Sequence, residues 1–173
     1  GHDHRVHAVD AKNGANISGY TQILADVGFE TNHLVINNTI YAGNRDGHLY
    51  ALDAVNGSLK WKYKTGGSIQ YSAAYKNGVV YFASKDARAY ALNASNGSLV
   101  WKSQKLPGSG FQTYWPVVYT HAASGKDYVV FTSGENYRFG IKNMVIEESD
   151  TIYCGVPDSA LIGPISTSIS GDW

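Results

Sequence analysis

A short run near the amino terminus holds the residues best suited to bind a metal ion. His2, His4 and His7 lie close together, with Asp3 between the first two. On a β-strand residues 2 and 4 share one face, and neutral imidazoles there could bind a transition metal. His7 also occupies a position at which tyrosine recurs later in the chain, and so it has a packing role available. The cluster is therefore a weak metal candidate, with packing as the alternative.

Other residues with reactive or ligating side chains lack the spacing of a known site. Glu147, Glu148 and Asp150 could offer oxygen ligands to calcium, but they lack the pattern of a dedicated calcium loop, and a solvated turn is the alternative. Cys154 is the only cysteine, which excludes an internal disulfide and a cysteine zinc cluster. No nucleophile elbow, P-loop or Rossmann glycine pattern occurs. We therefore predict no catalytic residue, no metal and no cofactor for this chain.

Composition bounds the class of protein. The chain has 173 residues, enough for one domain with a sizeable core, and 43% of them are hydrophobic. Lys and Arg together number 14, as do Asp and Glu, so no net field attracts nucleic acid or anionic lipid. No apolar run approaches the roughly 20 residues of a membrane span. The sequence starts at Gly1 and not at Met, so we expect a processed, trimmed or incomplete chain.

The strongest pattern is a repeat with a period of 40 residues. Residues 50–61 return almost unchanged as residues 90–101, and residues 7–14 are a worn third copy. In each copy, alternating large and small residues predict a half-buried strand. The following Asp or Asn and the Asn-Gly pair predict a tight turn, after which the chain returns as an antiparallel strand.

Alanine, Asp or Asn, glycine and tryptophan keep a fixed spacing in the two best copies. A tryptophan at such a distance can lie flat on the turn of a neighbouring repeat, where small residues leave room for its ring. We expect a structural docking role for eight residues, namely Ala51, Asp53, Gly57, Trp61, Ala91, Asn93, Gly97 and Trp101.

This spacing resembles the tryptophan-docking motif of the quinoprotein (PQQ-type) β-propeller family, which includes PQQ-dependent alcohol dehydrogenases. The resemblance covers residues 35–106 well and residues 2–34 and 107–173 loosely. It implies an all-β propeller of four-stranded antiparallel blades. It also implies that the dehydrogenases hold PQQ with adjacent cysteines, a calcium ion and a catalytic aspartate. Since Cys154 is alone, this chain cannot supply adjacent cysteines.

Turn signals divide the chain into about four blades' worth of sequence within one propeller domain or fragment, 1–173. The repeats are expected at 2–20 (partial), 28–67, 68–106, 110–143 (degenerate) and 144–173 (partial). In the last of them Thr151-Ile152-Tyr153 parallels Thr39-Ile40-Tyr41. Two arrangements remain open: a four-blade ring closed by both ends of the chain, or a piece of a larger propeller of seven or eight blades, which we favour.

These features favour a non-catalytic binding or scaffolding module of an exported protein, with other proteins, further blades or copies of itself as partners. Its interaction surface is expected at Phe111–Val118 and Glu135–Met144, which break the repeat. One alternative is a part of a PQQ-dependent dehydrogenase whose cofactor site lies outside this chain. Another is a structural subunit of an extracellular layer or fibre.

We expect the protein to work outside the cytoplasm, in the periplasm, at the cell surface or secreted, mainly because the resembled family is mostly exported. Sequons of the Asn-x-Ser/Thr type fall in expected exposed turns, where they could carry glycans. They are at Asn16, Asn37, Asn56, Asn93 and Asn96. Ligand, partner, oligomeric state and blade number are not determined by the sequence.

Overall fold

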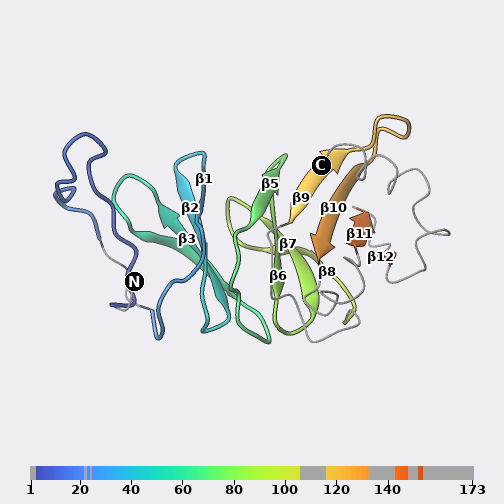
Figure 1. The fold of residues 1–173 in the computed structure, drawn as a ribbon, viewed down its shortest axis with the longest axis horizontal. Coiled ribbons are helices and arrows are strands. Elements are labelled where there is room, and N and C mark those ends of the chain that lie inside the picture. The colour runs from blue at the N-terminus through green and yellow to red at the C-terminus, as the bar shows by residue number, and fades with distance from the viewer. Residues whose placement is uncertain are drawn as a thin grey trace.

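The computed structural model describes residues 3–21, 23, 25–105, 116–132, 143–147 and 152–153, the last two ranges as strand backbone only. These residues form twelve β-strands and no helix, which confirms the expected all-β class (Figure 1). The strands are β1 (Leu34–Ile36), β2 (Thr39–Gly43), β3 (His48–Asp53), β4 (Leu59–Lys64), β5 (Ala74–Lys76), β6 (Val79–Ser84), β7 (Arg88–Asn93), β8 (Leu99–Lys102), β9 (Val117–Thr120), β10 (Asp127–Thr132), β11 (Asn143–Glu147) and β12 (Ile152–Tyr153). No described segment forms a helix long and apolar enough to cross a membrane.

The strands form three antiparallel sheets of four. Their orders are β1-β2-β3-β4, β5-β6-β7-β8 and β9-β10-β11-β12, so each strand lies beside its neighbour in the chain. The sheets follow one another along the longest axis of the molecule, with the amino-terminal segment beyond the first sheet (Figure 1). Stacked four-stranded meanders of this kind are the blades of a β-propeller.

The hairpin turns follow from their residue types. Asn37 and Asn38 connect β1 to β2 with φ of 48° and 55°, and Asn77 and Gly78 connect β5 to β6 with φ of 49° and 83°. Two central residues with positive φ define the type I′ turn, whose twist matches that of the flanking strands. Asparagine and glycine tolerate this conformation best, and so the chain reverses at these points.

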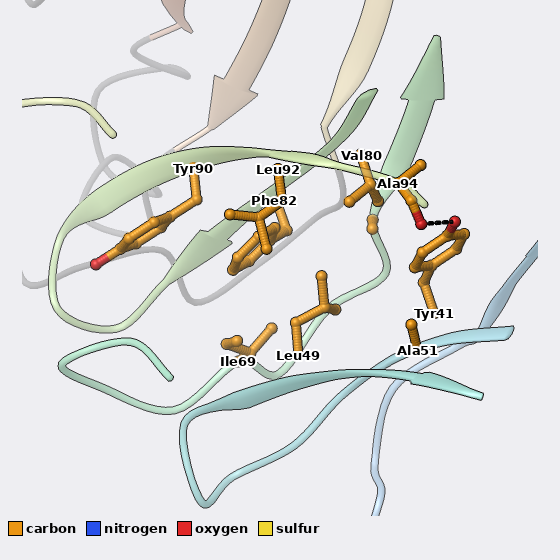
Figure 2. Close-up of a cluster of buried hydrophobic side chains, with 10 residues drawn as sticks. Tyr41, Leu49, Ala51, Ile69, Val80, Phe82, Tyr90, Leu92 and Ala94 are labelled. Carbon is orange, nitrogen blue, oxygen red and sulfur yellow. Dashed lines mark hydrogen bonds between the residues drawn. The ribbon is translucent and has the colours of Figure 1, made fainter. Parts of the chain in front are cut away.

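The core between the first and second sheets is built from the faces that meet there. Tyr41, Leu49 and Ala51 come from the first sheet, while Phe82 and Leu92 come from the second. All five are buried, and Figure 2 shows them converging from facing strands. Since β2 and β6 are covered on both faces, they read as nearly continuous apolar runs and do not alternate.

Two further cores hold the remaining layers. Tyr81 and Trp101 of the second sheet pack with Val129 and Phe131 of the third. On the far side of the first sheet, a third cluster gathers side chains from the amino-terminal segment and from β2 and β3; its buried members are Val6, Ala25, Phe29, Ile40, Ala42, Tyr50 and Leu52.

The third sheet differs from the expected boundary between repeats at residues 143–144. β11 pairs with β10 with Val130 opposite Val145, and β12 pairs with β11 with Ile152 opposite Ile146. Residues 143–147 and 152–153 therefore continue the sheet begun by β9 and β10. Strand periodicity reports that a segment is extended and half-buried, but it does not report which sheet the segment joins.

Candidate interaction surface

The repeated motif forms a turn at residues 10–14, 53–57 and 93–97. In each, the N–H of the closing glycine donates to the carbonyl oxygen of the first residue at 2.8 Å. The Oδ1 atom of that first residue accepts the N–H two residues on, at 2.7–2.9 Å. The glycines have φ of 72–75°. The same local chemistry therefore builds the same turn three times, including in the worn first copy.

Trp61 lies across the seam between the first and second sheets. A Cβ atom added to Gly97 would come within 2.7 Å of Cδ2 and Cε3 of the Trp61 ring. The indole Nε1 of Trp61 donates to the carbonyl oxygen of Ala94 at 3.1 Å. The hydroxyl of Tyr41 donates to the same oxygen at 2.9 Å, as Figure 2 shows. The first sheet thus holds the turn of the second by one flat contact and two hydrogen bonds.

Small residues stand opposite both tryptophans. Ala51 pairs with Trp61 across β3 and β4, and Ala91 pairs with Trp101 across β7 and β8. Both alanines are fully buried. Trp101 is itself buried and meets Tyr81 at a ring-centroid distance of 6.0 Å. Its side chain thereby joins the core that faces the third sheet.

Tyr20 makes the corresponding contact one repeat earlier, and the sequence patterns did not identify it. A Cβ atom on Gly57 would lie 2.7 Å from the Tyr20 ring and 2.1 Å from the carbonyl oxygen of Thr21. The N–H of Thr21 also donates to the carbonyl oxygen of Asn56 at 2.6 Å. Tyr20 comes ten residues after Asp10, whereas the tryptophans come eight after the first turn residue. The feature of the sequence that could have identified Tyr20 was an aromatic residue soon after the glycine that closes a turn.

In the first and second sheets, an aspartate two residues before the third strand accepts a hydrogen bond from the side chain four residues on. Asp46 accepts the hydroxyl of Tyr50 at 2.6 Å, and Asp86 accepts that of Tyr90. Burial, together with the hydrogen bond to a carboxylate, raises the pKa of both tyrosines. These hydroxyls therefore stay protonated donors throughout the physiological range.

The amino-terminal histidines follow this pattern. His7 Nε2 pairs with Asp3 Oδ2, as the tyrosines do with their aspartates. His4 has φ of 60° and matches Gly47 and Ala87, which follow the other two aspartates with φ of 85° and 65°. His2 lies outside the described residues. Among the residues that are described, no group of three or more His, Cys, Asp or Glu could hold a metal ion.

A polar link ties the second sheet to the third. The Nζ atom of Lys76 on β5 contacts Oγ1 of Thr120 and Oδ1 of Asp127, which belong to β9 and β10. The hydrogen bonds from Lys76 and Thr120 hold the pKa of Asp127 below its usual range. This link adds a charged contact at the seam where Trp101 packs.

The outer strands differ in what they expose. On β4, Lys60, Lys62 and Lys64 alternate along the strand, and charges of this kind protect a sheet edge. Lys60 Nζ lies 3.3 Å from Oδ2 of Asp53, so the ammonium group forms an ion pair within its own sheet. On β8 the position equivalent to Lys60 is Val100, which is 52% exposed beside the exposed Leu99. Val100 is thus an apolar side chain on an outer strand.

The two segments expected to bind partners fall mostly outside the described residues. Of Phe111–Val118 the structure describes Pro116 to Val118, and of Glu135–Met144 only the first two residues of β11. Val117 on β9 is 46% exposed, while Val118 packs against the core of the second and third sheets. Val117 is therefore a described and accessible part of the expected surface.

Three of the sequon asparagines, Asn37, Asn56 and Asn96, lie in turns, whereas Asn93 ends β7 and Asn16 forms a bridge with Val9. The side chains of Asn16, Asn37, Asn56 and Asn96 are exposed, and that of Asn93 is half-buried. Oδ1 of Asn93 accepts both the N–H and the hydroxyl of Ser95 within its turn. The exposed asparagines are thus more accessible to modification than Asn93.

Comparisons with known proteins give a matching family and several similar folds. The family described as outer membrane protein assembly factor BamB matches residues 2–142. Among solved structures, BamB from Moraxella catarrhalis is 18% identical, with a TM-score of 0.65 over 87% of this chain. Quinohemoprotein alcohol dehydrogenase ADHIIG from Pseudomonas putida HK5 is 24% identical, with a TM-score of 0.58 over 75% of this chain. The computationally designed Ika8 protein is 12% identical, with a TM-score of 0.66 over 90% of this chain.

At these identities the similarity to the three structures shows the fold, a β-propeller built from PQQ-like repeats. The chain spans 42% of the BamB chain, 21% of the dehydrogenase chain and 45% of the Ika8 chain, less than half of each. No curated protein matches the sequence.

Proposed function

The chain belongs to the family described as outer membrane protein assembly factor BamB, and from this premise we propose that it acts as a non-catalytic binding or scaffolding module. The observation that supports this role most directly is the locking of adjacent sheets. Tyr20 lies on Gly57, and Trp61 lies on Gly97 with its indole hydrogen-bonded to the same turn. Contacts of this kind make a stack of sheets rigid, and a rigid frame presents its surface residues in a fixed arrangement to a partner.

The eight residues from Ala51 to Trp101 singled out by their spacing serve as docking units in this proposal. Their part is structural, since the alanines and glycines leave room for the rings and the aspartate or asparagine closes each turn. The partner is a protein. The family description, which names assembly of outer membrane proteins, supports both this class of partner and a location outside the cytoplasm.

Photo-cross-linking from defined positions tests the binding role. A photoreactive amino acid at Val117 or Val100 should yield a discrete adduct of higher mass in cells that make the protein. The same residue at Val55, which is 64% exposed on a turn, is the matched control and should not. If neither position gives an adduct beyond that of the control, the proposed surface is wrong. Mass spectrometry of the adduct identifies the partner.

A second candidate is a part of a quinoprotein dehydrogenase, favoured by the structural similarity to the quinohemoprotein alcohol dehydrogenase. The resemblance implies a PQQ site with adjacent cysteines and a calcium ion. The described residues do not fit this group, because they contain no cluster of His, Cys, Asp or Glu for the metal. Cys154 is the only cysteine of the chain. We therefore derive no step through PQQ.

The two candidates separate in a simple assay. Because the second candidate places the cofactor site outside this chain, the intact protein is purified from its natural source, incubated with PQQ and calcium, and then with an alcohol and a redox dye. The scaffolding proposal expects no alcohol-dependent reduction of the dye. Dye reduction together with a bound-quinone absorbance band would replace the scaffolding role with the enzymatic one.

Modification of the exposed sequons and a location outside the cytoplasm are checked together. Cell fractionation reports the compartment, and the intact mass of the protein from its source reports any sugar. An unmodified protein found in the cytosol would contradict both expectations.

A further inference from the structure

Asparagine is followed directly by glycine at four places in the chain, namely at Asn13, Asn56, Asn77 and Asn96. Asparagine is a thermolabile residue, because its side-chain amide can be lost when the backbone nitrogen of the next residue attacks Cγ. A following glycine favours this attack, since it has no side chain to shield its nitrogen. The four pairs share this local sequence, but the structure holds them in different ways.

Three of the pairs lie in the turns of the repeated motif, where both reacting groups are bonded. In each turn the N–H of the glycine donates to the carbonyl oxygen of the first turn residue at 2.8 Å. The Oδ1 atom of the asparagine accepts the N–H of the residue two places on at 2.9 Å. These hydrogen bonds must break before the glycine nitrogen can reach Cγ. The asparagines protected in this way are Asn13, Asn56 and Asn96.

Two of these three turns are also covered by an aromatic ring. A Cβ atom added to Gly57 would lie 2.7 Å from the Tyr20 ring, and one added to Gly97 would lie 2.7 Å from the Trp61 ring. Gly14, in contrast, has no atom within 4 Å of an added Cβ. Opening the second and third turns therefore displaces a packed ring, whereas opening the first breaks hydrogen bonds alone.

The fourth pair, Asn77-Gly78, forms the two-residue turn between β5 and β6. Among the residues that the structure describes, the N–H of Gly78 donates to no acceptor and the side chain of Asn77 has no hydrogen-bond partner. Asn77 is exposed, and a Cβ atom added to Gly78 would meet nothing within 4 Å. Both reacting groups of this pair are thus free of the restraints that hold the other three.

The equivalent turn one sheet earlier gives the reason. Nδ2 of Asn37 donates to the hydroxyl of Tyr75, which lies on β5 of the next sheet, at 3.1 Å. The pairing of β9 with β10 places Val118 at the position that Tyr75 occupies on β5. Because valine has no hydroxyl, Asn77 lacks the partner that Asn37 has.

We propose that Asn77 is a site of spontaneous deamidation and that it reacts before the other three Asn-Gly pairs. The nitrogen of Gly78 forms a bond to Cγ of Asn77, and the bond from Cγ to Nδ2 breaks. The proton of the Gly78 N–H leaves with Nδ2 as ammonia. Water then opens the cyclic imide at either carbonyl carbon and leaves aspartate or isoaspartate at position 77. The modification is independent of which protein the module binds.

The isoaspartate product weakens the contact between the first and second sheets. The carbonyl oxygen of Gly78 accepts the N–H of Ala94 at 2.8 Å. The carbonyl oxygen of Ala94 in turn accepts the indole of Trp61 and the hydroxyl of Tyr41, the second of which Figure 2 shows. Isoaspartate lengthens the backbone within a two-residue turn and so displaces the oxygen that holds Ala94. Deamidation of Asn77 thereby loosens the turn on which Trp61 lies.

Peptide mapping by mass spectrometry tests the order of reaction in one sample of the purified chain, kept in mildly alkaline buffer. Asn77 should lose its amide at least tenfold faster than Asn56 and Asn96, with Asn13 between them. Labelling by an isoaspartyl methyltransferase should locate isoaspartate at position 77. Equal rates at the four sites, or a faster reaction at any other of them, would overturn the proposal.

The same mapping on the chain unfolded in urea shows whether the structure sets this order. The four rates should then come together, because each asparagine is followed by the same residue and no turn remains. If Asn77 still reacts tenfold faster than the others in urea, its neighbours in the sequence set the rate and the structural argument is wrong.

Gly78→Asn is the matched variant, because it copies the Asn-Asn pair of the first hairpin, where Asn38 has φ of 55°. The space around Gly78 admits the new side chain, and asparagine tolerates positive φ, so the turn should form as before. The added side chain shields the nitrogen and should slow the reaction at Asn77 at least tenfold. After equal incubation, the wild-type chain should unfold at a lower urea concentration than before, and the variant should not. Equal loss of amide at Asn77 in both proteins, or an equal fall in stability, would contradict the proposal.

Discussion

Replacing Gly97 with alanine tests whether Trp61 locks the first sheet to the second. Gly97 has φ of 73°, and its missing side chain is what lets the Trp61 ring approach the turn. An added Cβ atom would lie 2.7 Å from two ring carbons, too close for van der Waals contact. The ring must therefore move, and its hydrogen bond to Ala94 must lengthen or break.

The cost has two parts, and the chain offers a control for the first. An alanine at left-handed φ costs about 1–2 kcal/mol. Gly14 closes the same turn with φ of 72° and has no atom within 4 Å of an added Cβ, so Gly14→Ala should cost only this amount. At Gly97, displacing the packed ring adds about 1–3 kcal/mol, and loss of the indole hydrogen bond adds about 1 kcal/mol. We expect Gly97→Ala to cost about 3–6 kcal/mol.

Urea unfolding followed by circular dichroism measures both variants, and a double-mutant cycle with Trp61→Ala isolates the contact. Once the ring is removed, Gly97→Ala should cost no more than Gly14→Ala. The coupling free energy between the two substitutions should be at least about 1 kcal/mol, in the range found for residues in contact. Gly78→Ala in the same sheet, with φ of 83° and open space around its Cβ position, controls for location.

Equal costs for Gly97→Ala and Gly14→Ala would refute the reasoning. So would additivity of Gly97→Ala and Trp61→Ala, because the ring and the glycine would then act independently. Either outcome would remove the physical basis for treating the repeat spacing as a docking unit.

Three further perturbations test the local chemistry of the repeats. Ala87→Gly should stabilise the protein by up to about 1 kcal/mol, because Ala87 has φ of 65° and relief of that strain outweighs the loss of one methyl group; destabilisation in thermal unfolding would contradict this. Tyr90→Phe should cost about 1–2 kcal/mol near pH 7, because Asp86 loses its hydroxyl donor in a buried setting. The raised pKa of Tyr90 means that this hydroxyl stabilises the fold below pH of about 10 and less above it, so the cost should shrink in alkaline urea titrations. The lowered pKa of Asp127 means that its carboxylate stabilises the fold above the ordinary value of about 3.9 and that this stabilisation is lost as the pH falls further. Lys76→Met should therefore make the free energy of unfolding depend less on pH in the acid range. An unchanged dependence would contradict the role of Lys76.

The sequence alone determined the class of fold and the chemistry of each turn. The period of 40 residues, the alternation of Tyr50 to Asp53 and the Asn-Gly pairs are local features, and their consequences are local too. A strand followed by an Asp-closed turn folds back on itself wherever it stands, which is why even the worn copy at residues 10–14 forms the same turn. The family resemblance followed from the same spacing.

The contacts between repeats were predictable only where the spacing was regular. Trp61 and Gly97 keep that spacing. Tyr20 contacts Gly57 but stands two residues further along its repeat, so a pattern of fixed sequence spacing does not identify it. His7 was offered as a metal ligand or as a packing residue. The structure pairs it with Asp3 in the way that Asp46 holds Tyr50.

Only the tertiary structure decided how the strands are distributed among sheets. β11 and β12 read as the start of a new repeat, yet they complete the sheet of β9 and β10. The exposure of Val9, against the burial of its equivalents Leu52 and Leu92, likewise appears only when the neighbouring strands are in place. Periodicity reports the conformation of a segment, but a strand edge is satisfied by whichever backbone lies next to it. That neighbour is set by the packing of the whole chain and not by the residues of the strand itself.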